Sequence, residues 1–426
     1  MATRRDFLHL SLGGLLGAAM SARLPAHARA WPLPGQPTGG PGPTGPAAKA
    51  CILLWMNGGP SHVDTWDPKP GTVEGGPFKA IPTRIPKVSI CEHLPRLAEA
   101  ADKLCIVRSL GTREGNHDRA RHLVHTGYAP SPTVAHPSLG AWVSEELGRP
   151  DADLPAYVAI NGAGAPAGFL GVQHGPFRVQ DPAKPPQNVA PAAGVDPERF
   201  RLRQEALAHL EADFAARTAD GLVKGRMQVY DKARRLMASS RLDAFDLGQE
   251  SEATRDRYGR TTFGEGCLLA RRLVEAGVPF VEVGLDGWDT HKDGFTREAA
   301  LMASLDAGFG ALLLDLAERG RLQDTLVLCL GEFGRTPAIN ADEGRDHHPQ
   351  AWSAVLAGAG IRVGQAWGAT DRTGEAVVDR PVRIEDFFAT LATVLGLDAT
   401  RQFATPLGRP LTIVNKGVPV AGLLRT

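Results

Sequence analysis

The chain has 426 residues, of which 43% are hydrophobic and 22% charged, so it can form one large globular domain or two. Its 47 Lys and Arg residues balance 47 Asp and Glu residues. This balance excludes the broad positive surface by which many proteins bind nucleic acids or anionic membranes. We therefore expect no nucleic-acid partner.

The first thirty residues have the features of an export signal. Arg4 and Arg5 form a twin-arginine pair, a mostly apolar run follows as far as Met20, and Ala28-Arg29-Ala30 offers a cleavage site of small residues. The alternative is a frayed N-terminal helix. We interpret residues 1–30 as a twin-arginine signal peptide, which predicts contact with the twin-arginine export machinery and a location in the periplasm or at the cell surface.

Residues 31–47 are rich in Pro and Gly, which is typical of a linker, and one domain is expected to fill residues 48–426. No further segment has the length and composition of a membrane span, so none is expected in the mature protein. The five cysteines lack the paired spacing of a disulfide or zinc framework, and we interpret them as small core residues. They are Cys51, Cys91, Cys105, Cys267 and Cys329.

Apolar runs and helical patterns alternate through the first half of the domain. Continuous apolar runs predict strands that are buried on both faces of a sheet. Such runs lie at Ala50–Met56, Leu104–Leu110 and Tyr157–Ile160. Helices are predicted at Arg119–His125 and Ser138–Leu147. Residues 161–195 are rich in Gly, Pro and Ala and predict an irregular loop region, and residues 196–250 predict a charged helical insertion.

The alternation becomes regular after the insertion. Helices are predicted at Thr262–Ala276, Ala299–Arg319 and Arg383–Leu395. Strands are predicted at Pro279–Leu285, Thr325–Leu330 and Ala351–Ala357. Alternating helices and apolar strands predict an α/β fold, with a mostly parallel central sheet and helices on both faces. In such folds ligands bind beyond the carboxyl ends of the strands.

Acidic residues and histidines follow two of these strands and gather in one later loop. Asp289 and His291 lie in a tight turn after a strand, and we interpret them as a metal-ligand pair, although Asp286 could replace Asp289. The alternative is a capping Asp beside a surface His. Carboxylates and imidazoles supply the lone pairs that zinc and manganese accept.

Two further segments belong with this pair. Glu332 follows a strand and stands near Arg335, which fits either a metal ligand with an anion-binding guanidinium or a simple ion pair. Asp346 and His347 lie in a glycine-bearing loop, and His347 is the favoured ligand of that loop, where the alternative is a surface histidine.

Two segments near the N-terminal strands also carry polar residues. Asp64, with Ser61 and His62, follows the first strand and could face the same edge of the sheet, or it could belong to a Gly/Pro loop. The segment from Gly115 to Arg121 follows the second strand. It predicts either an anion-binding site at a helix N-terminus or a polar loop that caps the helix.

These motifs resemble the DUF1501 family of exported bacterial proteins over nearly the whole chain. The resemblance rests on Gly58-Gly-Pro-Ser-His-Val-Asp-Thr-Trp-Asp-Pro-Lys-Pro70, Gly287-Trp-Asp-Thr-His291, Glu332-Phe-Gly-Arg-Thr-Pro337, Gly344-Arg-Asp-His-His-Pro349 and Gly368-Ala-Thr-Asp371. That family is similar in fold to the alkaline phosphatase and sulfatase superfamily, whose members use metals to hydrolyse phosphate or sulfate esters. The domain is therefore expected to be alkaline-phosphatase-like.

The resemblance implies roles for single residues. Asp289, His291 and His347 would hold one divalent metal (zinc, manganese or calcium), and Glu332, Asp64 and Asp346 would hold a second or support the first. Arg121 and Arg335 would hold the anion of a small-molecule or polysaccharide ester. His117 takes the place of the sulfatase nucleophile, and it would attack, act as a general acid or bind metal. Alternatively a metal-activated water attacks, and Thr112 and Ser61 are the nearby hydroxyls.

The function that follows is an exported, metal-dependent hydrolase of phosphate or sulfate esters. Because a Ser, Thr or Cys nucleophile is missing from its expected place, a second hypothesis stays open. In that hypothesis the protein keeps the fold without catalysis, and it binds a sulfated polysaccharide or a partner at the cell surface.

Overall fold

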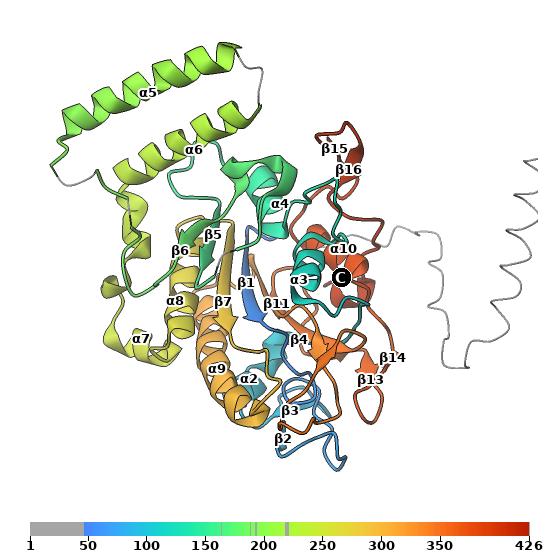
Figure 1. The fold of residues 1–426 in the computed structure, drawn as a ribbon. Helices are drawn as coiled ribbons and strands as arrows, with labels where there is room; N and C mark the ends of the chain where they lie inside the picture. The colour runs from blue at the N-terminus through green and yellow to red at the C-terminus, as the bar shows by residue number, and fades with distance from the viewer. Residues whose placement is uncertain (1–46, 163, 188, 192–193, 218–220, 426) are drawn as a thin grey trace, which may run out of the picture. The chain divides into compact units, whose positions relative to one another are not determined.

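The computed structural model of the protein has an eight-stranded central sheet (Figure 1). It describes residues 47–162, 164–187, 189–191, 194–217 and 221–425, so the predicted signal peptide and nearly all of the predicted linker lie outside the described residues. The strand order is β12-β4-β11-β8-β1-β7-β5-β6. The strands are β1 (Ala50–Asn57), β4 (Leu104–Leu110), β5 (Tyr157–Ile160), β6 (Phe177–Val179), β7 (Phe280–Asp286), β8 (Thr325–Leu330), β11 (Trp352–Gly358) and β12 (Gln365–Trp367).

Within this sheet β11 alone runs against its neighbours, and the other seven strands are parallel. The prediction of a mostly parallel sheet is therefore confirmed. The central strands β8, β1 and β7 lie side by side, so their carboxyl ends meet at one edge of the sheet.

Helices cover both faces of the sheet, which explains why most side chains of its central strands are apolar, although β4 carries Arg108 and β7 carries Glu282. Along β1 the side chains alternate between two buried clusters, with Ile52 and Leu54 on one face and Leu53 and Trp55 on the other. Each large apolar side chain that is fully buried stabilises the fold by about 1.5–3 kcal/mol.

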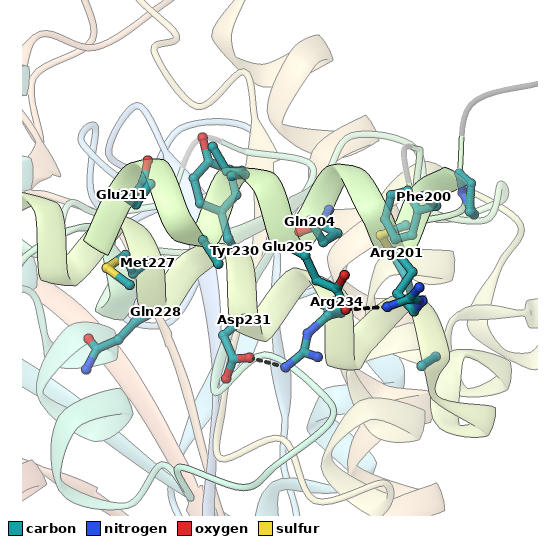
Figure 2. Close-up of a pocket in the computed structure, with 15 residues that line it drawn as sticks. Phe200, Arg201, Gln204, Glu205, Glu211, Met227, Gln228, Tyr230, Asp231 and Arg234 are labelled. Carbon is teal, nitrogen blue, oxygen red and sulfur yellow. Dashed lines mark hydrogen bonds and ion pairs between the residues drawn. The ribbon is translucent and has the colours of Figure 1, made fainter. Parts of the chain in front are cut away.

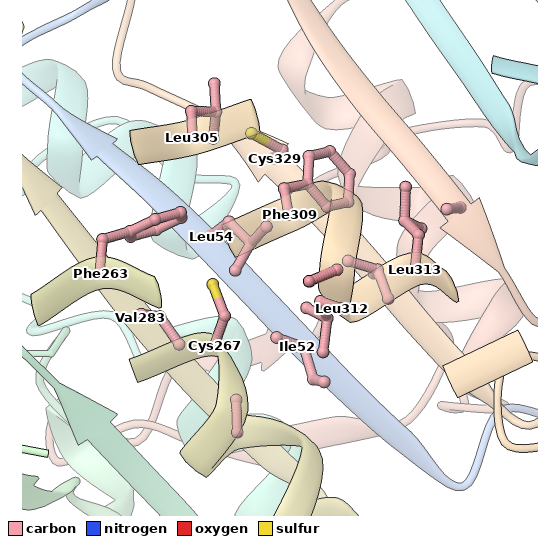
Figure 3. Packing of buried hydrophobic residues seen from close by; sticks show 14 of the residues in the cluster. Ile52, Leu54, Phe263, Cys267, Val283, Leu305, Phe309, Leu312, Leu313 and Cys329 are labelled. Carbon is pink, nitrogen blue, oxygen red and sulfur yellow. The ribbon is translucent and has the colours of Figure 1, made fainter. Parts of the chain in front are cut away.

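Four helices supply most of the helical residues of the first cluster, to which Leu236 also belongs, and three helices lie on the opposite face. The first set is α2 (Pro95–Glu99), α7 (Glu252–Tyr258), α8 (Thr262–Glu275) and α9 (Gly294–Glu318). The opposite set is α3 (His117–Thr126), α4 (Leu139–Glu146) and α10 (Ile384–Val394). Figure 3 shows Phe309 and Leu312 of α9 and Cys267 of α8 packed over Ile52 and Leu54.

The region of the predicted helical insertion contains two long helices, α5 (Pro197–Arg217) and α6 (Gly221–Ala238), followed by short 3-10 turns. The two helices lie alongside one another beyond the β5–β6 edge of the sheet (Figure 1). Between them is a mostly apolar groove of about 760 Å³, to which Phe200, Met227 and Tyr230 contribute (Figure 2).

Short antiparallel strand pairs form separate two-stranded sheets beside the main sheet. They are β2 (Ala80–Pro82) with β3 (Ser89–Cys91), β9 (Gly334–Arg335) with β10 (His347–His348), β13 (Ala369–Thr370) with β14 (Val377–Asp379), and β15 (Gln402–Ala404) with β16 (Pro410–Thr412). The pair β9–β10 matters most for the site, because its antiparallel register sets Arg335 opposite His347.

The structure differs from the predicted elements in detail. Helix α9 begins at Gly294, five residues before the predicted Ala299, because its first turn lacks the apolar spacing on which the prediction depended. The region predicted as an irregular loop contains β6, and β12 was not predicted, since both strands are only three residues long.

The sequence analysis predicted no further membrane span, but helix α9 is long and apolar enough to pass as one by length and composition alone. However, 61% of its most apolar stretch is buried inside the fold. Since its leucines pack against the sheet, its hydrophobicity is explained by the core.

Candidate metal centre

Residues beyond the carboxyl ends of three neighbouring strands build the site. Asn57 ends β1 and is in register with Asp286, which ends β7. Asp289 lies three residues past β7, and Glu332 lies two residues past β8. Parallel strands that end at one edge therefore bring the polar residues of distant segments together, as the sequence predicted.

A glycine after β1 allows the segments to approach closely. Gly58 has a φ of +117°, and a Cβ atom there would lie 2.4 Å from the backbone nitrogen of Asp289. The backbone N–H of Gly58 also donates to both carboxylate oxygens of Glu332, at 3.0 and 3.2 Å. Gly58 thus links the residue past β8 to the loop past β7, in a conformation that favours glycine.

Three imidazoles converge on one carboxylate oxygen. The Oδ1 atom of Asp289 lies 3.1 Å from Nε2 of His291 and 3.4 Å from Nε2 of both His117 and His347. The Nε2 atoms of His291 and His347 are 3.0 Å apart. We call these four residues the histidine cluster. Its atoms come from three segments: the first turn of α3, the loop past β7, and β10.

In each histidine of the cluster the other ring nitrogen, Nδ1, forms a hydrogen bond to an oxygen outside the cluster. Nδ1 of His117 contacts Oε1 of Glu332 at 2.8 Å, and Nδ1 of His291 contacts Oδ1 of Asp346 at 2.8 Å. Nδ1 of His347 contacts the carbonyl oxygen of Gly115, also at 2.8 Å. Because carbonyl and carboxylate oxygens only accept, each Nδ1 carries the proton, and in the neutral rings each Nε2 presents a lone pair.

The histidine cluster fits a divalent transition metal. Nε2 of His291 accepts from Nη1 of Arg335 at 3.2 Å, whereas Nε2 of His117 is buried without a hydrogen-bond partner. The lone pairs of His117 and His347 that face the carboxylate oxygen would be stabilised by a cation or by extra protons. The ligand atoms of His117, His347 and Asp289 all lie within 4.8 Å of one another, and His291 adjoins two of them. Imidazole nitrogens and a carboxylate oxygen are ligands that zinc accepts. Histidine ligands whose second nitrogen donates to a carboxylate or a carbonyl are also the usual arrangement at metal sites.

Arg335 lies behind Asp289 and is fully buried. Its Nη2 donates to Oδ1 of Asp289 at 2.5 Å and to the carbonyl of Gly58, and its Nε donates to the carbonyl of Gly59 at 2.9 Å. Partial burial raises the pKa of Asp289, but Arg335 and the nearby histidines outweigh this effect and lower the pKa to about 2. Asp289 is therefore ionised at any physiological pH.

The pKa values of His117 and His347 shift in opposite directions. The hydrogen bond to Glu332 raises the pKa of His117. Partial burial, together with the charge of Arg335, lowers the pKa of His347. A neutral His347 beside an ionised Asp289 is the protonation state that a metal ligand requires.

An aromatic ring fixes two of the histidines. Phe333 is fully buried, and its ring centroid lies 4.9 Å from that of His117 and 4.6 Å from that of His347. Phe333 directly follows Glu332, where the resemblance to phosphatases would place a second ligand. In this chain the position supplies packing for the histidine rings instead.

The structure brings together most of the predicted site residues but arranges them differently from the prediction. Asp289, His291 and His347 lie together, and His117, for which attack, acid catalysis or metal binding was expected, lies with them. Glu332 and Asp346 were predicted as ligands, but they contact the far nitrogens of His117 and His291. Whether any of these residues binds a metal stays a prediction.

Three other predicted residues also have partners that bear on their roles. Both oxygens of Asp64 accept from Arg345, so Asp64 lies outside the cluster and is not free to act as a ligand. Most donors of Arg335 serve Asp289 and backbone carbonyls, which leaves little for an external anion. Arg121 lies one helical turn after His117, and its Nη2 donates to Oδ1 of Asn57 at 2.5 Å.

Sequence reasoning missed two residues beneath the cluster, Thr290 and Glu298. Thr290 lies between the two predicted ligands Asp289 and His291 in the sequence, and this position could have indicated that it helps to place them. Glu298 gave no such signal, because a single Glu near the start of a helix usually faces solvent.

A family model described as "Protein of unknown function (DUF1501)" matches residues 48–424. No curated protein matches this sequence. The chain is similar to a protein of the alkaline phosphatase superfamily from Vibrio parahaemolyticus, with 14% identity, a TM-score of 0.39, and coverage of 84% of this chain and 69% of that one.

Two further solved structures are similar at the same level. One is the PsFucS1 sulfatase from Pseudoalteromonas sp., with 13% identity, a TM-score of 0.38, and coverage of 83% and 68%. The other is the lipoteichoic acid synthase LtaP from Listeria monocytogenes, with 10% identity, a TM-score of 0.38, and coverage of 83% and 74%. Likenesses this weak leave the function to be inferred from the side chains of this chain.

Proposed function

The chain belongs to the DUF1501 family, and we propose that it is an exported, metal-dependent hydrolase of phosphate or sulfate esters. The observation that carries the proposal is the convergence of three imidazole Nε2 atoms on Oδ1 of Asp289, with every Nδ1 held from behind. Asp289 is exposed to solvent, so a metal held there would have room for a water as an additional ligand, which a catalytic site requires.

The ligand chemistry narrows the choice of metal. Calcium and magnesium prefer oxygen ligands, whereas three imidazoles with one carboxylate favour zinc or another transition metal. Among the metals predicted from the sequence, we therefore favour zinc, with manganese second. A divalent cation held by His117, His291, His347 and Asp289 would act as a Lewis acid and activate a water for attack on the ester.

The residues around the cluster support an anionic substrate. Arg121 is partly buried on the same face of α3 as His117, and its Nε is buried without a hydrogen-bond partner. His117 is the first residue of α3, so that helix N-terminus lies beside the cluster, although Asn116 caps it by accepting from the backbone N–H of Arg119. A guanidinium and a helix N-terminus both favour a phosphate or sulfate group at this place.

Water is the nucleophile that the described residues support best. Among them, no hydroxyl or thiol forms a hydrogen bond to His117, Asp289, His291 or His347. Ser61 accepts from the backbone of Asp64, and Thr112 accepts from that of Glu114. Burial raises the pKa of all five cysteine thiols, so none is a ready nucleophile.

The missing side-chain nucleophile also favours a second candidate function. The protein could use the same metal site to bind a sulfated polysaccharide or a cell-surface partner without hydrolysis. In both cases we propose export by the twin-arginine route to the periplasm or cell surface, on the basis of Arg4, Arg5 and the apolar run that follows them.

Turnover assays separate the two functions. The mature protein, loaded with zinc or manganese, is assayed with aryl phosphates and aryl sulfates, beside His291→Ala and the control His348→Gln. The hydrolase is supported if the wild type and His348→Gln hydrolyse an ester and His291→Ala does not. A wild-type protein that binds zinc but hydrolyses neither ester class would overturn it in favour of binding alone.

A further inference from the structure

Two acidic side chains lie buried beneath the histidine cluster and belong to no step of the proposed chemistry. Asp64, past the end of β1, is 1% exposed, and Glu298, in the second turn of α9, is 2% exposed. Buried carboxylates are costly unless they are paired, so each needs a structural or functional reason.

Asp64 holds the loop that carries His347. Its Oδ2 accepts from Nε of Arg345 at 2.5 Å, and its Oδ1 accepts from Nη2 of Arg345 at 2.8 Å. Arg345 is also fully buried, and it directly precedes Asp346 and His347 in the chain. A bidentate contact of this kind fixes both the position and the direction of the guanidinium. It thereby fixes where the segment enters β10.

Glu298 holds the loop that carries Asp289 and His291. The residue between them, Thr290, is 1% exposed and donates its hydroxyl to Oε1 of Glu298 at 2.7 Å. The two loops are also tied to each other, because the backbone N–H of Arg345 donates to the carbonyl of Thr290 at 3.2 Å.

The charges of this layer are compatible with burial. Burial, and then the negative charge of Asp64, raise the pKa of Glu298 to about 8. Glu298 is therefore largely neutral at pH 7, and the remaining charge of Asp64 is balanced by Arg345. Glu298 then accepts from Thr290 through Oε1 without adding a second buried negative charge, while its Oε2 is buried without a hydrogen-bond partner.

We infer that Asp64, Arg345, Thr290 and Glu298 form a positioning layer that sets the distance between the Asp289–His291 loop and His347. Asp64 acts through Arg345 on one loop, and Glu298 acts through Thr290 on the other. The inference deepens the proposed function and rests on the metal binding that it assumes. It replaces the predicted role of Asp64 as a ligand with a role in holding the ligands.

The test compares two substitutions of Thr290 that separate the effect of its hydroxyl group from that of its methyl group. Thr290→Ser keeps the hydroxyl and removes the methyl group, whereas Thr290→Val keeps the methyl group and removes the hydroxyl. The measurement is the zinc Kd of the purified mature protein, obtained by competition with a chelating dye. Contacts behind metal ligands typically change affinity about 10–100-fold. We expect that loss for Thr290→Val and a Kd within about threefold of wild type for Thr290→Ser.

A double variant distinguishes a loss of zinc affinity from a loss of folding. Thr290→Val leaves Glu298 without its donor in a buried place, which itself destabilises the fold. Thr290→Val with Glu298→Leu removes both polar partners, and we expect it to fold and to bind zinc at least about tenfold more weakly than wild type.

Each outcome decides a different claim. Equal zinc affinity of the folded double variant and the wild type would overturn the positioning layer, as would a Thr290→Ser variant weakened as much as Thr290→Val. A wild type that binds zinc but hydrolyses no ester removes the hydrolase proposal and leaves the layer to be judged by these Kd values. A wild type that binds no zinc overturns both.

Discussion

The Nε2 atoms of His291 and His347 lie 3.0 Å apart, although neither ring has a proton to share there in its neutral form. Nδ1 of His291 donates to Asp346, and Nδ1 of His347 donates to the carbonyl of Gly115. Two lone pairs at this distance are unfavourable, Nη1 of Arg335 relieves part of the repulsion by donating to Nε2 of His291 at 3.2 Å, and Oδ1 of Asp289 lies close to both nitrogens. A cation among the three atoms turns this repulsion into ligation.

Loss of one ligand should remove the effect of zinc on stability. For the wild type, zinc at about 100 times its Kd should add about 2.7 kcal/mol to the free energy of unfolding. We expect His291→Ala to lose nearly all of this gain. The control is His348→Gln, because His348 neighbours His347 but contacts the carbonyl of Glu375. Urea unfolding with and without zinc measures the effect, and an equal gain in both variants would contradict the site.

The two carboxylates behind the histidines should differ in importance. Glu332 is fully buried and also accepts from Gly58, whereas the side chain of Asp346 is 62% exposed, so water can replace it. We expect Glu332→Gln to weaken zinc binding about 10–100-fold and Asp346→Asn to weaken it less. Zinc titration of the two variants measures this order. The reverse order would show that burial does not decide the strength of the contact.

Gly58 should tolerate no side chain. Alanine at a positive φ costs about 1–3 kcal/mol anywhere, and at Gly58 its Cβ would also meet the backbone of Asp289. The control is Gly71→Ala, since Gly71 has a φ of +78° but no atom within 4 Å of its Cβ position. We expect Gly58→Ala to lose more stability than Gly71→Ala, and also to lose zinc affinity. Equal losses in urea unfolding would mean that the close approach is unimportant.

Glu298 should make the metal-free protein less stable as pH rises. Its pKa is about 8 in the fold against 4.5 in the unfolded chain, so the folded state binds more protons between these values. Stability contributed by this proton is therefore lost as pH rises from about 4.5 to about 8. Glu298→Gln should reduce that loss, while Glu318→Gln at the exposed end of α9 should not. Urea unfolding across this pH range tests it, and parallel curves for wild type and Glu298→Gln would exclude the shifted pKa.

The strands could be predicted because helices cover both faces of the sheet. Burial on both faces makes β1 and β8 nearly continuous apolar runs and β4 and β7 mostly apolar, and that pattern is visible in the sequence. The short β6 and β12 carry too few residues for a pattern. The antiparallel direction of β11 has no local signal, since an apolar run reads alike in both directions.

The site could be predicted as a set of residues but not as an arrangement. Acids and histidines after parallel strands indicated where the cluster forms. Which nitrogen of a histidine faces the cluster depends on contacts from other segments, such as the carbonyl of Gly115 behind His347. For the same reason Glu332 and Asp346 could not be distinguished from ligands, nor Asp64 from a residue that holds Arg345.

The most direct test is a crystal structure of the mature protein grown with zinc, with diffraction recorded at the zinc absorption edge. We predict one strong anomalous peak per chain, about 2.0–2.2 Å from Nε2 of His117, His291 and His347 and from Oδ1 of Asp289. A peak at other residues, or unchanged spacing of these four atoms without a peak at saturating zinc, would contradict the metal centre.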